Sequence, residues 1–161
     1  MSHLMGVCGL VMEHGGNEDQ CIAALLHDAV EDQGGRATGD EIEQRFGAEV
    51  RRIVDGCSDC ETEPKPPWRE RKTSYLEHLR QAPADIRLVS CCDKLHNART
   101  LVVDLRNVGP SMWARFNASP EDTLWYYRSL VTAFQQSGGP LALANELSRT
   151  IDALEDLIAT A

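Results

Sequence analysis

The chain has 161 residues, of which 42% are hydrophobic and 25% are charged, and its formal net charge at neutral pH is −9. These values predict one soluble globular domain, and the acidic balance argues against nucleic-acid binding, which needs a basic face. We find no apolar run of the ~20 residues that cross a bilayer and no signal-peptide pattern at the start of the chain. We therefore expect a cytoplasmic protein with no nucleic-acid partner and no membrane partner.

Hydrophobic residues recur with helical spacing along nearly the whole chain, which predicts an all-α fold of about eight helices in a single domain, residues 1–161. Asn17 and Gln20 have capping-box spacing and predict the start of the second helix, whereas Gly34 and Gly35 predict its end. A second capping box, opened by Thr38, predicts the start of another helix. The expected helices cover residues 3–13, 18–33, 39–46, 48–55, 68–81, 85–105, a short stretch around 113, 121–136 and 141–158, with a proline-containing loop over 58–67.

The segment His27-Asp28-Ala-Val-Glu31-Asp32 places an imidazole and three carboxylates within six residues. If the second helix continues through this segment, its period brings Glu31 and Asp32 back over His27 and Asp28. Acids near a helix C-terminus face the negative end of the helix dipole, which costs about 0.3–1 kcal/mol each. A bound cation would reverse the sign of that cost, so we interpret the segment as part of a metal site.

Asp93 lies inside the long helix expected over 85–105, among apolar neighbours. A carboxylate in such surroundings is costly unless it is hydrogen-bonded, paired or bound to a metal. Asn97 and Thr100 follow at four and seven residues and extend a polar stripe along the same helix. The alternative is a buried ion pair of Asp93 with Arg87 or Arg99. The presence of the His27-Asp28 segment elsewhere in the chain favours a metal ligand over this ion pair.

His3 opens the first expected helix, ahead of an apolar stripe. Taken alone, a histidine near a chain terminus is usually a solvated surface residue. Its interpretation as a ligand depends on the pattern that it completes, His3, then His27-Asp28, then Asp93.

This pattern resembles the HD superfamily of metal-dependent phosphohydrolases, which is named for its His-Asp pair. The segments His27-Asp28-Ala-Val-Glu31-Asp32 and Asp93-Lys-Leu-His-Asn97 are similar to the HDxxED and DKLxN segments of RelA/SpoT hydrolase domains and their small stand-alone relatives. The stretch 46–54 is similar to the corresponding helix of that family. The resemblance covers residues 3–105 and implies an HD-type helical bundle, which the helices in 109–160 complete.

The resemblance implies a metal-dependent phosphohydrolase that removes the 3′-pyrophosphate from guanosine 3′,5′-bis(diphosphate), (p)ppGpp. It also implies one divalent ion, for which mixed imidazole and carboxylate ligands favour Mn²⁺ over the alternatives Fe²⁺ and Zn²⁺. By the same resemblance the site residues have three roles: His3, His27, Asp28 and Asp93 bind the metal, Glu31 and Asp32 orient and deprotonate the attacking water, and Asn97 and Thr100 contact the nucleoside.

Two other functions stay open, a nucleotidase or phosphodiesterase for another nucleotide and a non-catalytic nucleotide-binding HD domain. In each case the partner is a phosphorylated nucleotide, and a homodimer is left open. The relatives carry basic residues ahead of their first ligand histidine, whereas the first Lys or Arg here is Arg36. Either the substrate differs, or the written start is internal to a longer product.

Three other groups of residues are less decisive. Basic residues near the motifs are either phosphate contacts or a solvated face, and late aromatic residues are either a pocket wall or part of the core or a dimer face. The cysteines are interpreted as reduced thiols, because the one CxxC pair has no second pair to complete a zinc site. The groups are Lys65, Arg69, Arg71, Lys72, Lys94 and Arg99; Trp113, Phe116 and 125–127; and Cys57, Cys60, Cys91 and Cys92.

Overall fold

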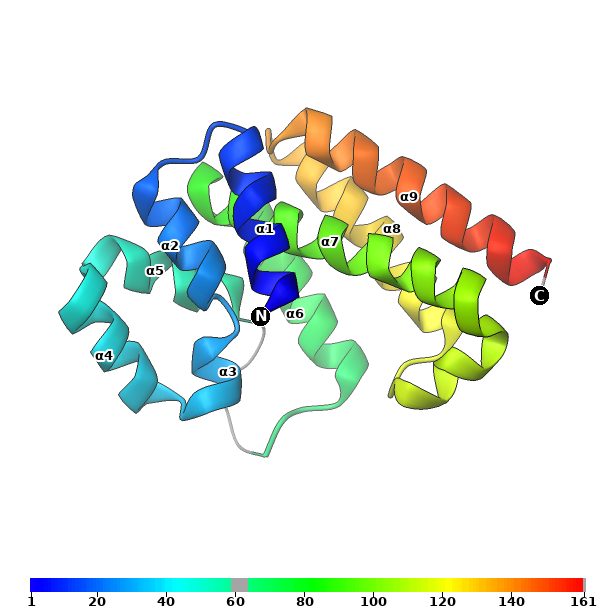
Figure 1. Cartoon of the computed structure of the whole chain (residues 1–161), viewed down its shortest axis with the longest axis horizontal. Helices are drawn as coiled ribbons and strands as arrows, with labels where there is room; N and C mark the ends of the chain where they lie inside the picture. The colour runs from blue at the N-terminus through cyan, green and yellow to red at the C-terminus, as the bar shows by residue number, and fades with distance from the viewer. Residues whose placement is uncertain (59–63, 161) are drawn as a thin grey trace.

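The computed structural model describes residues 1–58 and 64–160, and of Asp32 the backbone alone. Within these residues the protein is all-α, as predicted, with no strand (Figure 1). The elements are α1 (Ser2–Glu13), α2 (Glu18–Leu26), α3 (Ala29–Gln33), α4 (Arg36–Phe46), α5 (Ala48–Cys57), α6 (Trp68–Gln81), α7 (Ala84–Val108), the 3₁₀ helix η1 (Gly109–Arg115), α8 (Pro120–Gln136) and α9 (Leu141–Ala159).

The longest helix, α7, runs through the middle of the molecule and packs against α1, α5 and α9 (Figure 1). It begins directly after Pro83, whose ring cannot continue a helix from the preceding turn. It ends at Gly109, which adopts a φ of +71° that other residues rarely tolerate. Its buried side chains are mostly apolar, which matches the interpretation of this helix as central, although it extends three residues beyond the predicted end at Leu105.

The prediction of one continuous second helix through the His-Asp segment is wrong. The capping box of Asn17 and Gln20 is present as predicted, but α2 ends at Leu26. His27 and Asp28 then form a turn, and α3 carries the two following acids until Gly34. Glu31 and Asp32 therefore lie on a separate short helix, and the argument from one shared helix dipole does not hold.

The predicted capping box at Thr38 is also wrong. Helix α4 begins at Arg36, because Gly35 adopts a φ of +60° and turns the chain immediately after α3. Thr38 lies inside α4, where its hydroxyl donates to the carbonyl oxygen of Gln33 over 3.1 Å. The side chain thus connects α3 to α4 instead of capping its own helix.

The last two helices pack along α7 and against each other, and their buried aliphatic and aromatic side chains belong to one hydrophobic core. Cys91 and Cys92 are fully buried in this core, as expected for small apolar side chains. The five cysteines that the structure describes form no disulfide, whereas Cys60 of the CxxC pair lies outside the described residues. In the described parts of the chain no helix is both long and apolar enough to cross a membrane.

Candidate metal centre and adjoining pocket

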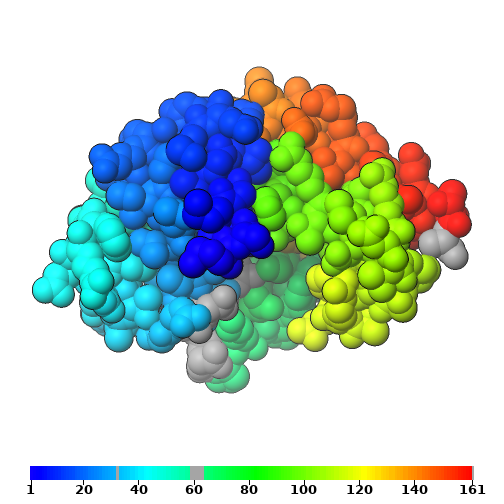
Figure 2. Space-filling view, in the orientation of Figure 1, coloured from blue at the N-terminus to red at the C-terminus, as the bar shows by residue number. Residues whose placement is uncertain are grey.

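Four polar side chains from three parts of the chain meet on one side of α7. His3 comes from the first turn of α1, His27 and Asp28 come from the turn between α2 and α3, and Asp93 comes from the middle of α7. His27 and Asp93 are among the few buried polar residues of the described chain, with 3% and 4% of their surfaces exposed. The start of α1 (dark blue) lies beside α7 (green) on the face shown in Figure 2.

The donor atoms of these side chains are close together. His3 Nε2 lies 3.3 Å from His27 Nε2, and these two nitrogens lie 3.2 and 3.4 Å from Asp93 Oδ1. Asp28 Oδ1 is 3.2 Å from His27 Nε2, and Asp28 Oδ2 is 3.8 Å from His3 Nε2. Donors bound about 2.1 Å from a tetrahedral ion lie about 3.4 Å from one another, so the separations between the two imidazoles and each carboxylate suit a shared cation. Among the described residues, the ligand atoms of His3, His27 and Asp28 all lie within 4.8 Å of one another, and Asp93 adjoins this group through its contacts with the two histidines.

His27, the histidine of the His-Asp pair, is oriented by a contact with the backbone. His27 Nδ1 lies 2.8 Å from the carbonyl oxygen of Ala24, which can only accept a hydrogen bond. Nδ1 therefore carries a proton, and in the neutral ring Nε2 presents its lone pair to the cluster. Ligating histidines in metalloproteins have this same outer hydrogen bond.

Asp93 has different partners on its two oxygens. Lys94 Nζ donates to Oδ2 over 2.6 Å, and the Asn97 amide donates to Oδ1 over 2.7 Å. Burial alone would raise the pKa of Asp93, but the Lys94 ammonium and the two histidines outweigh it and hold the pKa well below its usual range. Asp93 is thus an ionised carboxylate whose Oδ1 faces the histidines.

The alternative of an Asp93–arginine pair does not agree with the structure. The Arg87 guanidinium donates to the carbonyl oxygen of Ala82, and that of Arg99 donates to Glu146. Burial would lower the pKa of His27, yet the carboxylates of Asp93 and Asp28 raise it above its ordinary value. The cluster therefore attracts positive charge, which is the property that a cation site requires.

The two acids expected to act on water are only partly placed. Glu31 lies on α3 with its side chain 26% exposed, and Lys65 Nζ is 4.0 Å from its Oε2. The side chain of Asp32 lies outside what the structure describes. Their roles therefore stay predictions, although both belong to the helix that directly follows His27 and Asp28.

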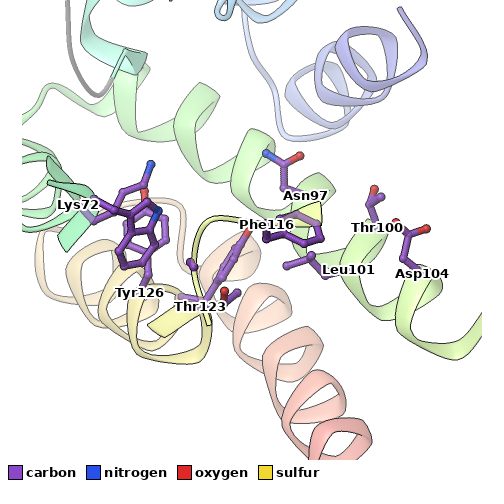
Figure 3. A pocket seen from close by; sticks show the side chains of 11 residues that line it. Lys72, Asn97, Thr100, Leu101, Asp104, Phe116, Thr123 and Tyr126 are labelled. Carbon is purple, nitrogen blue, oxygen red and sulfur yellow. The ribbon is translucent and has the colours of Figure 1, made fainter. Parts of the chain in front are cut away.

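A pocket of about 290 Å³ adjoins the cluster along α7 (Figure 3). Asn97 and Thr100, the two expected nucleoside contacts, both line it, and Asn97 also bonds to Asp93. The Thr100 hydroxyl donates to the carbonyl oxygen of His96 over 3.1 Å, so its oxygen can still accept a hydrogen bond. The other lining residues include Trp68, Lys72, Leu101, Asp104, Phe116, Thr123, Tyr126 and Tyr127.

The basic and aromatic residues near the motifs are only partly pocket residues. Of the basic residues, Lys72 lines the pocket, whereas Arg69 pairs with Asp122 and Arg99 pairs with Glu146. Of the aromatic residues, Phe116, Tyr126 and Tyr127 line the pocket, while Trp113 and Trp125 pack against the core. The pocket wall is thus partly aromatic.

One neighbour of the cluster was not predicted. His96, in the same segment as Asp93, has its Nδ1 3.0 Å from His3 Nδ1, on the side of that ring opposite the cluster. Nothing in the spacing of the motifs indicates this contact, because it depends on how α1 crosses α7.

The fold agrees with the comparisons to known proteins. The family model described as "HD domain" matches residues 1–124, which is more than half of the chain. The chain therefore belongs to the HD-domain family, as its resemblance to HDxxED and DKLxN segments predicted.

Among curated proteins, the chain is 39% identical over 116 residues to the guanosine-3′,5′-bis(diphosphate) 3′-pyrophosphohydrolase MESH1 of Xenopus tropicalis. The match covers 71% of this chain and 60% of that relative. The bifunctional (p)ppGpp synthase/hydrolase SpoT of Escherichia coli K12 is 34% identical over 107 residues, which cover 63% of this chain and 14% of that protein. The chain thus spans less than two thirds of the length of these relatives.

Two solved structures share the fold. The protein lmo0812 of Listeria monocytogenes EGD-e superimposes with a TM-score of 0.80 at 27% identity, covering 92% of this chain and 96% of that one. A metazoan SpoT orthologue, described as hydrolysing ppGpp, gives a TM-score of 0.72 at 24% identity, with 94% and 79% covered. The first likeness covers 92% of the chain, so it includes at least part of both α8 and α9.

Proposed function

We propose that this protein is a metal-dependent phosphohydrolase that removes the 3′-pyrophosphate of guanosine 3′,5′-bis(diphosphate) or a related nucleotide. The observation that carries the proposal is the convergence of two carboxylates, those of Asp28 and Asp93, on the same pair of imidazoles, with each carboxylate 3.2–3.8 Å from the Nε2 atoms of both His3 and His27. The names of the relatives support the reaction type, and the pocket beside the cluster supports a nucleoside as part of the substrate.

The four clustered side chains would hold one divalent ion. Two imidazoles and two carboxylates suit Mn²⁺, which we propose as the ion, with Fe²⁺ and Zn²⁺ as alternatives. When bound, the ion would lower the pKa of a water molecule and polarise a phosphoryl oxygen. We also keep the cytoplasm as the proposed location, since reduced thiols such as Cys91 and Cys92 are usual there.

Side chains around the cluster would accept the proton of the attacking water and position the substrate. Glu31 and Asp32 follow the His-Asp pair directly, and we propose that one of these carboxylates accepts the proton of the attacking water. Asn97 would position both the metal ligand and the nucleoside, since its amide donates to Asp93 while the residue lines the pocket.

The pocket would hold the nucleoside. Its aromatic rings, among them Trp68, Phe116 and Tyr126, provide apolar faces on which a base can stack. Lys72 Nζ lies 5.0 Å from the centre of the Tyr126 ring and places positive charge in the same wall, where a phosphate group would be attracted. The nucleoside would thus lie along α7, with its 3′-phosphates toward Asp93.

The test is phosphate release from a panel of nucleotides. Protein treated with a chelator and then supplied with Mn²⁺ is expected to release pyrophosphate from ppGpp and pppGpp, and the same protein without metal should release none. Turnover of 5′-nucleotides or cyclic nucleotides in place of these substrates would favour the nucleotidase or phosphodiesterase alternative. Saturable binding of ppGpp with no hydrolysis at any metal concentration would contradict the proposed activity.

A further inference from the structure

We propose that His96 is a positioning residue for His3 and that Gly6 provides the space that its ring needs. This inference rests on the metal centre of the proposed function, because it concerns how one of the four clustered side chains is held. The three residues come from two helices, since His3 and Gly6 lie on α1 and His96 lies on α7.

The contact between the two rings is direct. Their Nδ1 atoms are 3.0 Å apart, and the rings meet edge to face with an interplanar angle of 72° and centroids 4.8 Å apart. At this distance the two nitrogens share one proton, so one Nδ1 donates and the other accepts. The opposite nitrogen of His3, Nε2, is the atom that faces Asp93 and His27.

The sharing of this proton decides which nitrogen of His3 is available to a metal. If His3 donates through Nδ1 to His96, the neutral His3 ring presents an unprotonated Nε2 to the cluster. His96 must then be the tautomer that accepts at Nδ1 and carries its proton on Nε2. Outer partners of this kind fix the tautomer and orientation of ligating histidines.

His3 needs such a partner more than His27 does. His27 is buried and is anchored by the carbonyl oxygen of Ala24 in the preceding helix, α2. His3 lies in the first turn of α1, where no side chain caps the helix, and its side chain is 27% exposed. Residues at a helix start fray unless another part of the structure holds them, and His96 on the rigid central helix provides that contact.

Gly6 is the part of the arrangement that the sequence leaves unexplained. A glycine inside a helix costs about 1 kcal/mol relative to alanine, so its presence in the second turn of α1 needs a reason. A Cβ atom built on Gly6 would lie 2.4 Å from His96 Nε2 and 2.5 Å from His96 Cδ2. Any side chain at position 6 would therefore displace the ring that contacts His3.

The experiment measures Mn²⁺ binding to the chelator-treated full chain, by electron paramagnetic resonance of the free ion and without any nucleotide. His96→Ala is expected to weaken Mn²⁺ binding about 10- to 100-fold, the usual effect of losing an outer partner of a ligand. His96→Asn keeps an acceptor near the place of Nδ1 and is expected to recover most of the affinity. His14→Ala is the matched control, because it removes an imidazole from the far end of α1, and it should bind like the wild type.

Gly6→Ala provides the second arm. It is expected to weaken Mn²⁺ binding in the wild-type background and to have no further effect in the His96→Ala background, where no ring remains to be displaced. Wild-type affinity in His96→Ala, or an equal loss from Gly6→Ala in both backgrounds, would overturn the inference. A wild-type chain that binds no Mn²⁺ would overturn the metal centre itself, whereas a chain that binds Mn²⁺ without hydrolysing nucleotides would leave this inference intact.

Discussion

Asp93 and Lys94 are adjacent residues on α7 whose charged groups pair in the interior, with 6% and 16% of their side-chain surfaces exposed. The pairing leaves Asp93 Oδ1 directed at His3 and His27, so one carboxylate joins a structural ion pair to the candidate metal centre. Burial works against the charge of Lys94, but the Asp93 carboxylate outweighs it and raises the pKa of the amine well above its usual range. Each charge is therefore stable only because the other is present.

Lys94→Met tests this dependence. The variant leaves Asp93 buried without its ammonium partner, so the free energy of unfolding is expected to fall by about 3 kcal/mol. A divalent ion would supply positive charge to the same carboxylate, so saturating Mn²⁺ should recover part of the loss. Urea denaturation with and without Mn²⁺ measures both effects, and an equal loss under the two conditions would argue against an ion at Asp93.

A second pair of variants separates metal binding from proton transfer. Asp28→Ala removes a clustered carboxylate and is expected to lose both the metal and the activity. Glu31→Gln keeps the cluster and is expected to retain the metal while the rate falls by about 10²–10⁴-fold, the range for loss of a general base. Elemental analysis and single-turnover assays on the same preparations give the two readouts. Normal turnover by both variants would exclude this site as the place of hydrolysis.

At the scale of elements, helix ends decide where the site residues lie. Proline and glycine mark most of these ends, so the bounds of α6 and the start of α7 follow closely from the sequence. The break between α2 and α3 has no such mark, because His27 and Asp28 adopt nearly helical backbone angles, with φ of −60° and −92°. Local pattern alone could therefore not predict it.

The start of α7 is held by an ion pair to α5. The Arg52 guanidinium donates to Asp85 and to Glu49, and the Ile86 amide donates to Asp85 Oδ1 over 2.8 Å. Arg52 is the main reason that the pKa of Asp85 is lowered, and it outweighs the opposing effect of burial. The stabilisation is therefore complete above the unfolded pKa of about 3.9 and is lost as the pH falls through the lower folded pKa.

Asp85→Asn is expected to reduce the free energy of unfolding by about 1 kcal/mol at pH 6, a modest value because both partners are partly exposed. The difference between variant and wild type should shrink as the pH falls below 4, since the wild-type carboxylate becomes protonated as well. Urea denaturation across this pH range measures it. A difference that is the same at pH 6 and in acid would assign the effect to packing instead of charge.

At the scale of the whole molecule, the sequence could predict those site residues that lie together on the central helix α7. Asp93, Asn97 and Thr100 share one face of a single helix, so their spacing predicted one polar stripe, whereas their roles came from the family resemblance. The structure places Asn97 and Thr100 in one pocket. Joining them to His3 required the family resemblance, because the crossing of α1 over α7 has no signature in local sequence. The contact of His96 with His3 depends on that same crossing and could not be predicted.

The central claim is that side chains from α1, the α2–α3 turn and α7 bind one divalent ion. The most direct measurement is anomalous X-ray diffraction at the manganese edge from crystals grown with Mn²⁺. We expect one strong anomalous peak within coordination distance of His3 Nε2, His27 Nε2, Asp28 and Asp93 Oδ1. No peak there in crystals that contain Mn²⁺, or a peak bound by other side chains alone, would contradict the account.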